Sequence, residues 1–302
     1  MSTALSAIAV LSALKAEGLA VQEYGSWRTN NRNHKGPWGP VYGVVIHHTV
    51  TSADDSSVAL CYNGHSSLPG PLCHAVGRND GKIALVGHGR ANHAGLGDSD
   101  VLTAVRNETP LPVDNQADTD GNRHFYGLEI VNLGNGTDTY PWVQYVSAVK
   151  WATAHCRAHR WTERSAIAHK EWQPGKIDPK GPVVGPDGVF EFTMSRFRAD
   201  VRDALALPAG VWPKQAQEEE DVALTEEEIT KIAHRVWAFK NLDIDPRDMR
   251  QITADAASGA KTAATVAQEV ENKVDNLTVG GGVDLDVLAA KVADVLAARL
   301  SG

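Results

Sequence analysis

Two adjacent histidines, His47 and His48, are the first residues in this sequence whose setting suggests chemistry. They stand in the stretch Gly43–Val50, where valine, isoleucine and threonine fill most of the other positions. β-Branched residues suit a pleated, packed surface, so the stretch is predicted to be a buried strand. Because side chains alternate across a strand, the two histidines point to opposite faces. Only one of them, His47 or His48, can therefore face a given site, and the other is predicted to pack in the sheet.

A second strand supplies partners for such a histidine. His169 ends the short apolar stretch Ala166–Ala168, and Lys176 and Asp178 follow on a loop rich in proline and glycine. Imidazole and carboxylate both bind zinc, and three protein ligands leave a fourth position open for water. His47, His169 and Asp178 are therefore a candidate zinc site. With 12 histidines in the chain this pattern alone is weakly specific, and a histidine packed in the core remains the alternative.

Glu129 is the next residue with an unusual setting. It lies between Leu128 and Ile130 in the apolar stretch 126–132, where an unpaired carboxylate would be costly to bury. Three interpretations stay open. Glu129 forms a salt bridge at the strand end, or acts as a general base with a pKa raised by desolvation, or orients a ligand histidine.

The elements that would position these groups predict an α/β domain with a mixed central β-sheet flanked by helices. Asn79-Asp80-Gly81 marks a hairpin, whereas residues 98–124 are interpreted as a polar insertion and Gly87–Gly97 as too polar for the core. An apolar face of Leu5, Ile8, Leu11 and Leu14, closed by Gly18, predicts a first helix. The other predicted strands cover 21–24, 73–78, 82–86, 126–132 and 166–169, and the other predicted helices cover 54–62, 142–159 and 194–205.

Composition divides the chain into a domain over 1–208, a linker over 209–223 and an all-α segment over 224–302. The stretch Leu207–Asp221 has two prolines and an acidic run, which are typical of a linker. Thr225 with Glu228 is a capping box that begins the helical segment. Residues 215–302 carry 17 acidic and 9 basic side chains, which accounts for the whole net charge of −8. This acidity argues against a nucleic-acid partner.

The chain ends and the cysteines carry further expectations. The first apolar run lacks a basic segment before it, so we expect a docked helix rather than an export signal. No run reaches the ~20 apolar residues that span a bilayer. Three cysteines without a CxxC pair predict no disulfide framework and fit a reducing compartment at synthesis.

Four motifs, in this order along the chain, carry a resemblance to a known family. They span residues 40–180, and their combination resembles the zinc-dependent N-acetylmuramoyl-L-alanine amidases of the amidase-2 type, which include peptidoglycan recognition proteins. Within that group the chain is most similar to endolysins of phages that infect actinobacteria. The motifs are Val45-Ile46-His47-His48-Thr49, Asn92-His93-Ala94-Gly95, Tyr126-Gly127-Leu128-Glu129-Ile130-Val131-Asn132, and His169-Lys170-Glu171-Trp172 through Lys176-Ile177-Asp178-Pro179.

The resemblance implies a role for each matching residue. It makes His47, His169 and Asp178 the zinc ligands, the third being cysteine or aspartate in the family. It also implies that Glu129 is the general base and that Lys176 stabilises the oxyanion during hydrolysis of the amide between N-acetylmuramic acid and L-alanine. Relatives without the third ligand bind peptidoglycan but do not cut it, so a non-catalytic peptidoglycan-binding module is the alternative.

Several implied features are less specific. Asn92 and His93 would line the substrate groove or form a hydrogen-bond network in their loop, and Trp172 would face a sugar or pack beneath the loop. Some relatives have tyrosine where this chain has Cys73, which leaves Glu129 as the better candidate base. An endolysin would be made in the host cytoplasm and reach the wall after membrane permeabilisation. The C-terminal helices would bind the cell wall, form a homo-oligomer or fold as a small bundle.

Overall fold

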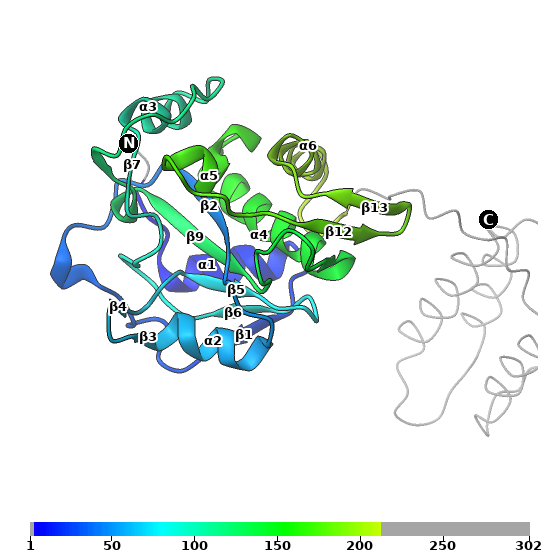
Figure 1. The fold of residues 1–302 in the computed structure, drawn as a ribbon, viewed down its shortest axis with the longest axis horizontal. Coiled ribbons are helices and arrows are strands. Elements are labelled where there is room, and N and C mark those ends of the chain that lie inside the picture. The colour runs from blue at the N-terminus through cyan, green and yellow to red at the C-terminus, as the bar shows by residue number, and fades with distance from the viewer. Residues whose placement is uncertain (1–2, 213–302) are drawn as a thin grey trace, which may run out of the picture. The chain divides into compact units, whose positions relative to one another are not determined.

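A six-stranded sheet lies at the centre of residues 3–212, which are the residues that the computed structural model describes (Figure 1). The hairpin strands pair antiparallel and all other neighbours pair parallel, so the predicted mixed sheet is confirmed. In spatial order the strands are β1 (Val21–Glu23), β6 (Ile83–Leu85), β5 (Ala75–Gly77), β9 (Phe125–Ile130), β2 (Gly43–His48) and β11 (Ala166–Ala168).

Helices cover both faces of this sheet. One face packs in a single apolar core against α1 (Ala7–Ala16), α4 (Trp142–His159) and α6 (Met194–Leu205). The other face carries α2 (Asp54–Asn63), α3 (Ser99–Arg106) and α5 (His169–Trp172). The predicted helices 54–62, 142–159 and 194–205 are confirmed.

The second face is covered in two separate patches, and this division creates the site. Val45 and Phe125 pack under α3 and α5, whereas Val76 packs under α2. Between the patches, the register of β2 and β9 aligns His47 with Glu129. Because aligned residues on parallel neighbours share a face, both side chains lie in the gap between the covering helices.

Smaller elements complete the described part of the chain. The hairpin of β12 and β13 was not predicted, since its first strand is short and begins with proline. The remaining elements are β3 (Gly64–His65), β4 (Leu68–Pro69), β7 (Leu96–Gly97), β8 (Thr119–Asp120), β10 (Tyr140–Pro141), β12 (Pro182–Gly185), β13 (Gly188–Glu191) and the 3₁₀ turns Asn33–Lys35, Gly121–Arg123 and Glu163–Ser165.

Two polar segments were interpreted wrongly from the sequence. The insertion 98–124 contains α3, whose Asp98 carboxylate accepts hydrogen bonds from the first helical N–H groups and whose Val101 and Val105 are buried. The glycine-flanked segment 87–97 is not outside the core, because Ala94 is fully buried there. In both cases a few apolar residues at helical or tight-turn spacing were outweighed by their polar neighbours.

Two further predictions, the buried face of the first helix and the end of the histidine strand, also need correction. In α1 the buried residues are Val10 and Leu14, whereas Ile8, expected on the apolar face, is 73% exposed. Strand β2 stops at His48 rather than Val50, because Val50 has a left-handed backbone with φ of 56°. That conformation is rare for a β-branched residue and turns the chain away from the sheet at the edge of the site.

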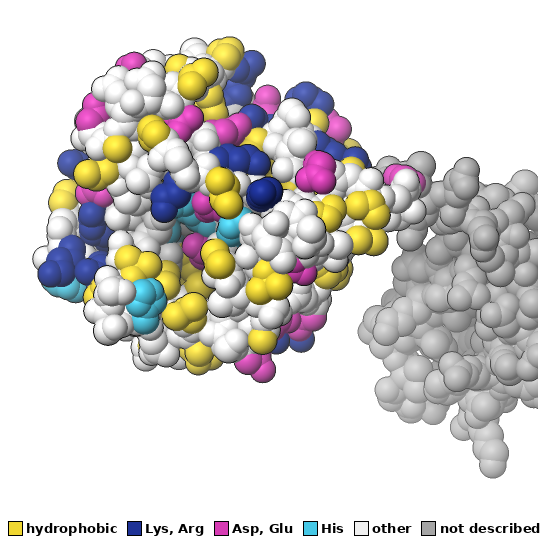
Figure 2. Space-filling view, viewed as in Figure 1, with side chains coloured by type: hydrophobic (Ala, Val, Ile, Leu, Met, Phe, Trp, Pro, Cys, Tyr) yellow, Lys and Arg dark blue, Asp and Glu magenta, His cyan; other side chains and the backbone are white. Residues whose placement is uncertain are grey.

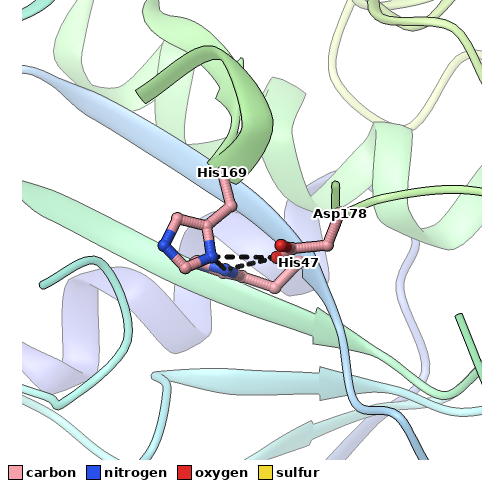
Figure 3. Close-up of side chains that lie close together, drawn as sticks. All are labelled: His47, His169 and Asp178. Carbon is pink, nitrogen blue, oxygen red and sulfur yellow. Dashed lines mark hydrogen bonds and ion pairs between the residues drawn. The ribbon is translucent and has the colours of Figure 1, made fainter. Parts of the chain in front are cut away.

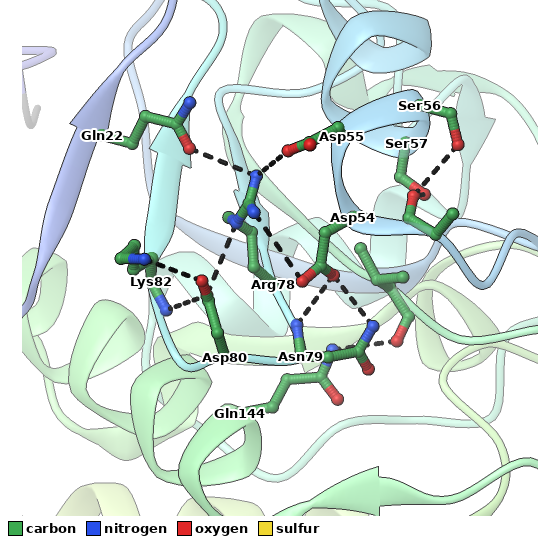
Figure 4. Close-up of polar contacts among 12 residues, drawn as sticks. Gln22, Asp54, Asp55, Ser56, Ser57, Arg78, Asn79, Asp80, Lys82 and Gln144 are labelled. Atoms are coloured by element: carbon green, nitrogen blue, oxygen red, sulfur yellow. Dashed lines mark hydrogen bonds and ion pairs between the residues drawn. The ribbon is translucent and has the colours of Figure 1, made fainter.

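Arg78 joins the start of α2 to the hairpin turn (Figure 4). Its guanidinium lies 2.7 Å from the Asp55 carboxylate, 3.4 Å from Asp80 and 3.9 Å from Asp54. Asp54 in turn accepts hydrogen bonds from the backbone and side chain of Asn79 at 2.9 and 2.8 Å. These contacts fix α2 over its patch of the sheet and so fix one wall of the gap.

A buried histidine in α4 predicts how stability depends on pH. Burial lowers the pKa of His155 to about 3, so between pH 6.5 and 3 the unfolded chain binds a proton that the folded chain does not. The folded protein should therefore become less stable as the pH is lowered. His155 should contribute up to about 2 kcal/mol to the decrease in the free energy of unfolding between pH 7 and pH 5. Urea unfolding at pH 7 and at pH 5 measures this change in the free energy of unfolding. In His155→Gln the loss should be smaller, and an unchanged loss would contradict the assignment.

The predicted helical segment 224–302, and most of the predicted linker 209–223, lie outside the described residues. Within residues 3–212, no helix is both long and apolar enough to cross a bilayer.

Candidate metal centre

Three side chains from three separate elements meet in the gap (Figure 3). His47 Nδ1 lies 3.0 Å from His169 Nδ1 and 3.1 Å from Asp178 Oδ2, and His169 Nδ1 lies 3.0 Å from the same oxygen. Ligand atoms of a tetrahedral zinc site with bonds of 2.0–2.1 Å are about 3.3 Å apart. The three residues predicted as ligands are therefore brought together at a spacing that fits one metal ion.

The fold explains why these three residues converge. Strands β2 and β11 are parallel neighbours, so His47 near the end of β2 and His169 directly after β11 lie at the same edge of the sheet. Asp178 is held beside them because the Lys170 N–H donates to its carbonyl at 3.0 Å. The short helix α5 is itself fixed by two hydrogen bonds of 2.8 Å from Arg198 to Glu171.

The electrostatics of the three groups favour a cation at their centre. Burial, with the neighbouring His169, lowers the pKa of His47 to about 4, so its imidazole is neutral at neutral pH. Burial opposes the charge of Asp178, but the imidazoles of His169 and His47 outweigh it and hold the pKa of that carboxyl well below its ordinary value. Two imidazoles and one carboxylate form a donor set typical of catalytic zinc.

Glu129 lies beside this centre, and one of its carboxyl oxygens has no hydrogen-bond partner among residues 3–212. Its Oε2 is buried and has no hydrogen bond to any described residue, and no ion pair of Glu129 occurs within 3–212, so the salt-bridge interpretation is not supported. Burial raises the pKa of the Glu129 carboxyl well above its ordinary value, with Cys61 and Asp178 adding to the effect and Lys176 opposing it. A buried carboxyl with a raised pKa is suited to proton transfer near neutral pH.

A cleft of about 430 Å³ opens over these groups and is lined by His47, Glu129, His169, Lys176 and Asp178. Figure 2 shows histidine side chains at the bottom of a hollow near the middle of this face. The exposed Lys176 borders the cleft from the loop that carries Asp178. The cleft therefore brings an ammonium group and a carboxyl group close to the three candidate ligands.

The remaining predicted residues lie at different depths. Asn92 lines the cleft, consistent with a groove position. His93 also borders the cleft but is only 8% exposed, and its imidazole contacts His47. Trp172 is fully buried and donates from Nε1 to the Ala94 carbonyl at 2.9 Å, so it packs beneath the loop and does not line the cleft.

Four residues near the centre complete its description. His48 lies on the opposite face of β2 from His47, as alternation predicts, and burial lowers the pKa of its imidazole. Cys61 and Cys73 are buried and free, and Cys73 has no phenol to offer where some relatives have tyrosine. His74, which follows Cys73, hydrogen-bonds to backbone groups of Gly89 and Gly127.

Comparison with known proteins shows what this chain is similar to. Residues 37–181 match the family model described as N-acetylmuramoyl-L-alanine amidase. A search of curated proteins gave no match. Among solved structures, a selenomethionine AmpD derivative is 19% identical with a TM-score of 0.38, and covers 61% of this chain and 96% of its own. AmpDh3 from Pseudomonas aeruginosa, in complex with anhydromuramic pentapeptide, is 17% identical with a TM-score of 0.35, and covers 76% of this chain and 78% of its own.

Proposed function

We propose that this protein is a zinc-dependent peptidoglycan amidase, because residues 37–181 match the family model described as N-acetylmuramoyl-L-alanine amidase. Its reaction would be hydrolysis of the amide between N-acetylmuramic acid and L-alanine. The observation that carries the proposal is the convergence of His47, His169 and Asp178 in a cleft that Glu129 also lines, with a buried Oε2 that has no partner among residues 3–212.

The residues divide the chemistry among them. His47, His169 and Asp178 would hold zinc, which when bound supplies a Lewis acid that polarises the scissile carbonyl and acidifies water. Glu129 would take the proton from the attacking water and pass it to the leaving amine. Lys176 would stabilise the negative charge that develops on the carbonyl oxygen. Burial of the ligands keeps bulk water from competing for their lone pairs.

Digestion of purified cell walls tests this function. The full chain with zinc should release new L-alanine amino termini from the walls, a chelator should abolish the release, and added zinc should restore it. Mass spectrometry of the fragments identifies the bond that is cut. Binding to walls with bound zinc but no new amino termini would instead establish a non-catalytic peptidoglycan-binding module, and cleavage of a different amide would establish another zinc hydrolase.

The motif resemblance to phage endolysins supports a more specific proposal. We infer that the protein is an endolysin, made in the host cytoplasm and acting on the wall once the membrane has been permeabilised. Walls of an actinobacterium are therefore the substrate of choice in the digestion, and failure on these walls with success on others would contradict this origin. Wall binding or self-association by residues 224–302 remains part of the same proposal.

A further inference from the structure

His93 contacts a metal ligand from the side opposite the metal position. Its Nδ1 lies 3.0 Å from His47 Nε2, while His47 Nδ1 faces His169 and Asp178. The other ring nitrogen of His93, Nε2, lies 3.1 Å from the carbonyl oxygen of Phe125. The two imidazoles and the carbonyl thus form a series of hydrogen bonds that ends at the β9 backbone.

The carbonyl at the end of this series fixes the direction of both hydrogen bonds in it. A carbonyl oxygen only accepts, so His93 Nε2 must carry the proton. A neutral imidazole has one N–H, and a buried, unpaired imidazolium would be costly, so His93 Nδ1 is an acceptor. His47 Nε2 must therefore donate to it. The single proton of His47 is then on Nε2, and Nδ1 presents a lone pair to the metal position.

The structure holds His93 firmly in this role. The Asn122 side-chain oxygen accepts hydrogen bonds from the backbone N–H groups of His93 and Ala94, both at 2.8 Å. Gly127 leaves room for the ring, because a Cβ at that position would lie 2.5 Å from His93 Nδ1. The glycine in the strand motif is thus explained by close approach of an imidazole.

We propose that His93 is a positioning residue that fixes the tautomer and orientation of His47 for metal binding, rather than a group that binds substrate in the groove. The inference rests on the proposed zinc centre but not on the identity of the amide cleaved. His169 has a parallel arrangement, since its Nε2 lies 3.2 Å from the Gln173 side-chain oxygen. Residues that hydrogen-bond to the nitrogen of a ligand histidine that does not bind the metal orient its ring and raise its affinity for the metal.

An isosteric pair of variants in the full chain separates positioning from packing. Asn and Leu have the same shape, but only Asn offers an acceptor where His93 Nδ1 stands. His93→Leu should weaken zinc binding about 10–100-fold in a chelator competition, the usual range for loss of such a partner. His93→Asn should bind zinc much more tightly than His93→Leu, and should match the thermal stability of the Leu variant or fall below it.

Two further measurements keep the test independent of folding defects. Gly127→Ala, which crowds the His93 ring, should also weaken zinc binding. His155→Leu is the matched control, because His155 is a buried histidine in α4, on the other face of the sheet, where its imidazole bonds to the Trp151 carbonyl, and its loss should leave zinc affinity unchanged. In zinc-free wild type, nitrogen NMR should place the His47 proton on Nε2, and in His93→Leu it should divide between both nitrogens.

The outcomes distinguish this inference from the proposed function. Wild-type zinc affinity in His93→Leu, or equal losses in the Leu and Asn variants, would overturn it. Zinc binding by the wild type without wall cleavage would overturn the amidase proposal alone. If the wild-type protein bound no zinc, both the His93 inference and the amidase proposal would be overturned.

Discussion

Asp178→Ala is expected to remove zinc binding and amide hydrolysis together. Asp178 Oδ2 contributes the one formal negative charge among the three converging atoms, and it lies 3.0 and 3.1 Å from the two imidazole nitrogens. Two imidazoles without the carboxylate would hold the ion far more weakly. Loss of a residue that only hydrogen-bonds to a metal ligand lowers metal affinity by at most ~100-fold, and loss of Asp178 itself should lower zinc affinity by more than that. Chelator competition and release of amino termini from walls measure the two effects.

Two variants give this experiment its controls. Asp178→Cys replaces the carboxylate with a thiolate, another good zinc ligand, and should retain much of the zinc affinity. Asp200→Asn removes a half-buried carboxylate that bonds to Tyr145 at 2.6 Å, away from the cleft, and should leave zinc binding unchanged. If Asp178→Ala kept both zinc and activity, Asp178 would not be a ligand.

The sequence predicted the parts of the site that follow from local periodicity. Alternation in β2 separated His47 from His48, and the apolar stretch before His169 identified the second strand at the same sheet edge. Both arguments need only a period of two and the end of a strand. The polar loop after His169 predicted the place of Asp178, and the family resemblance then distinguished this set from other combinations of histidines.

Contacts between distant segments were not predictable in this way. His93 meets His47 across a separation of 46 residues, and the segment that carries it is rich in glycine and polar residues, which are typical of an exposed loop. Its burial depends on Gly127 in another strand and on Asn122 in a turn. The aromatic Trp172 has an equally ambiguous sequence signal, since burial and sugar contact both suit its ring. Only packing decides between them.

Glu129→Gln is expected to lower kcat about 10²–10⁴-fold, the range for loss of a general base, while zinc affinity stays unchanged. The amide keeps the shape of the carboxyl but cannot take a proton from water. The three candidate ligand atoms contact one another and not Glu129, so its replacement should not disturb a bound ion. Wall digestion gives the rate and chelator competition gives the affinity.

The stability of the Glu129→Gln variant separates a catalytic role from a structural one. In the native protein a buried carboxyl oxygen has no hydrogen-bond partner among residues 3–212, which costs free energy of folding. A neutral amide should relieve part of that cost, so the melting temperature should stay level or rise as activity falls. Glu163→Gln, outside the cleft, should change neither property. A parallel loss of zinc affinity would instead show that Glu129 orients a ligand histidine, because a base acts on water and leaves the ion in place.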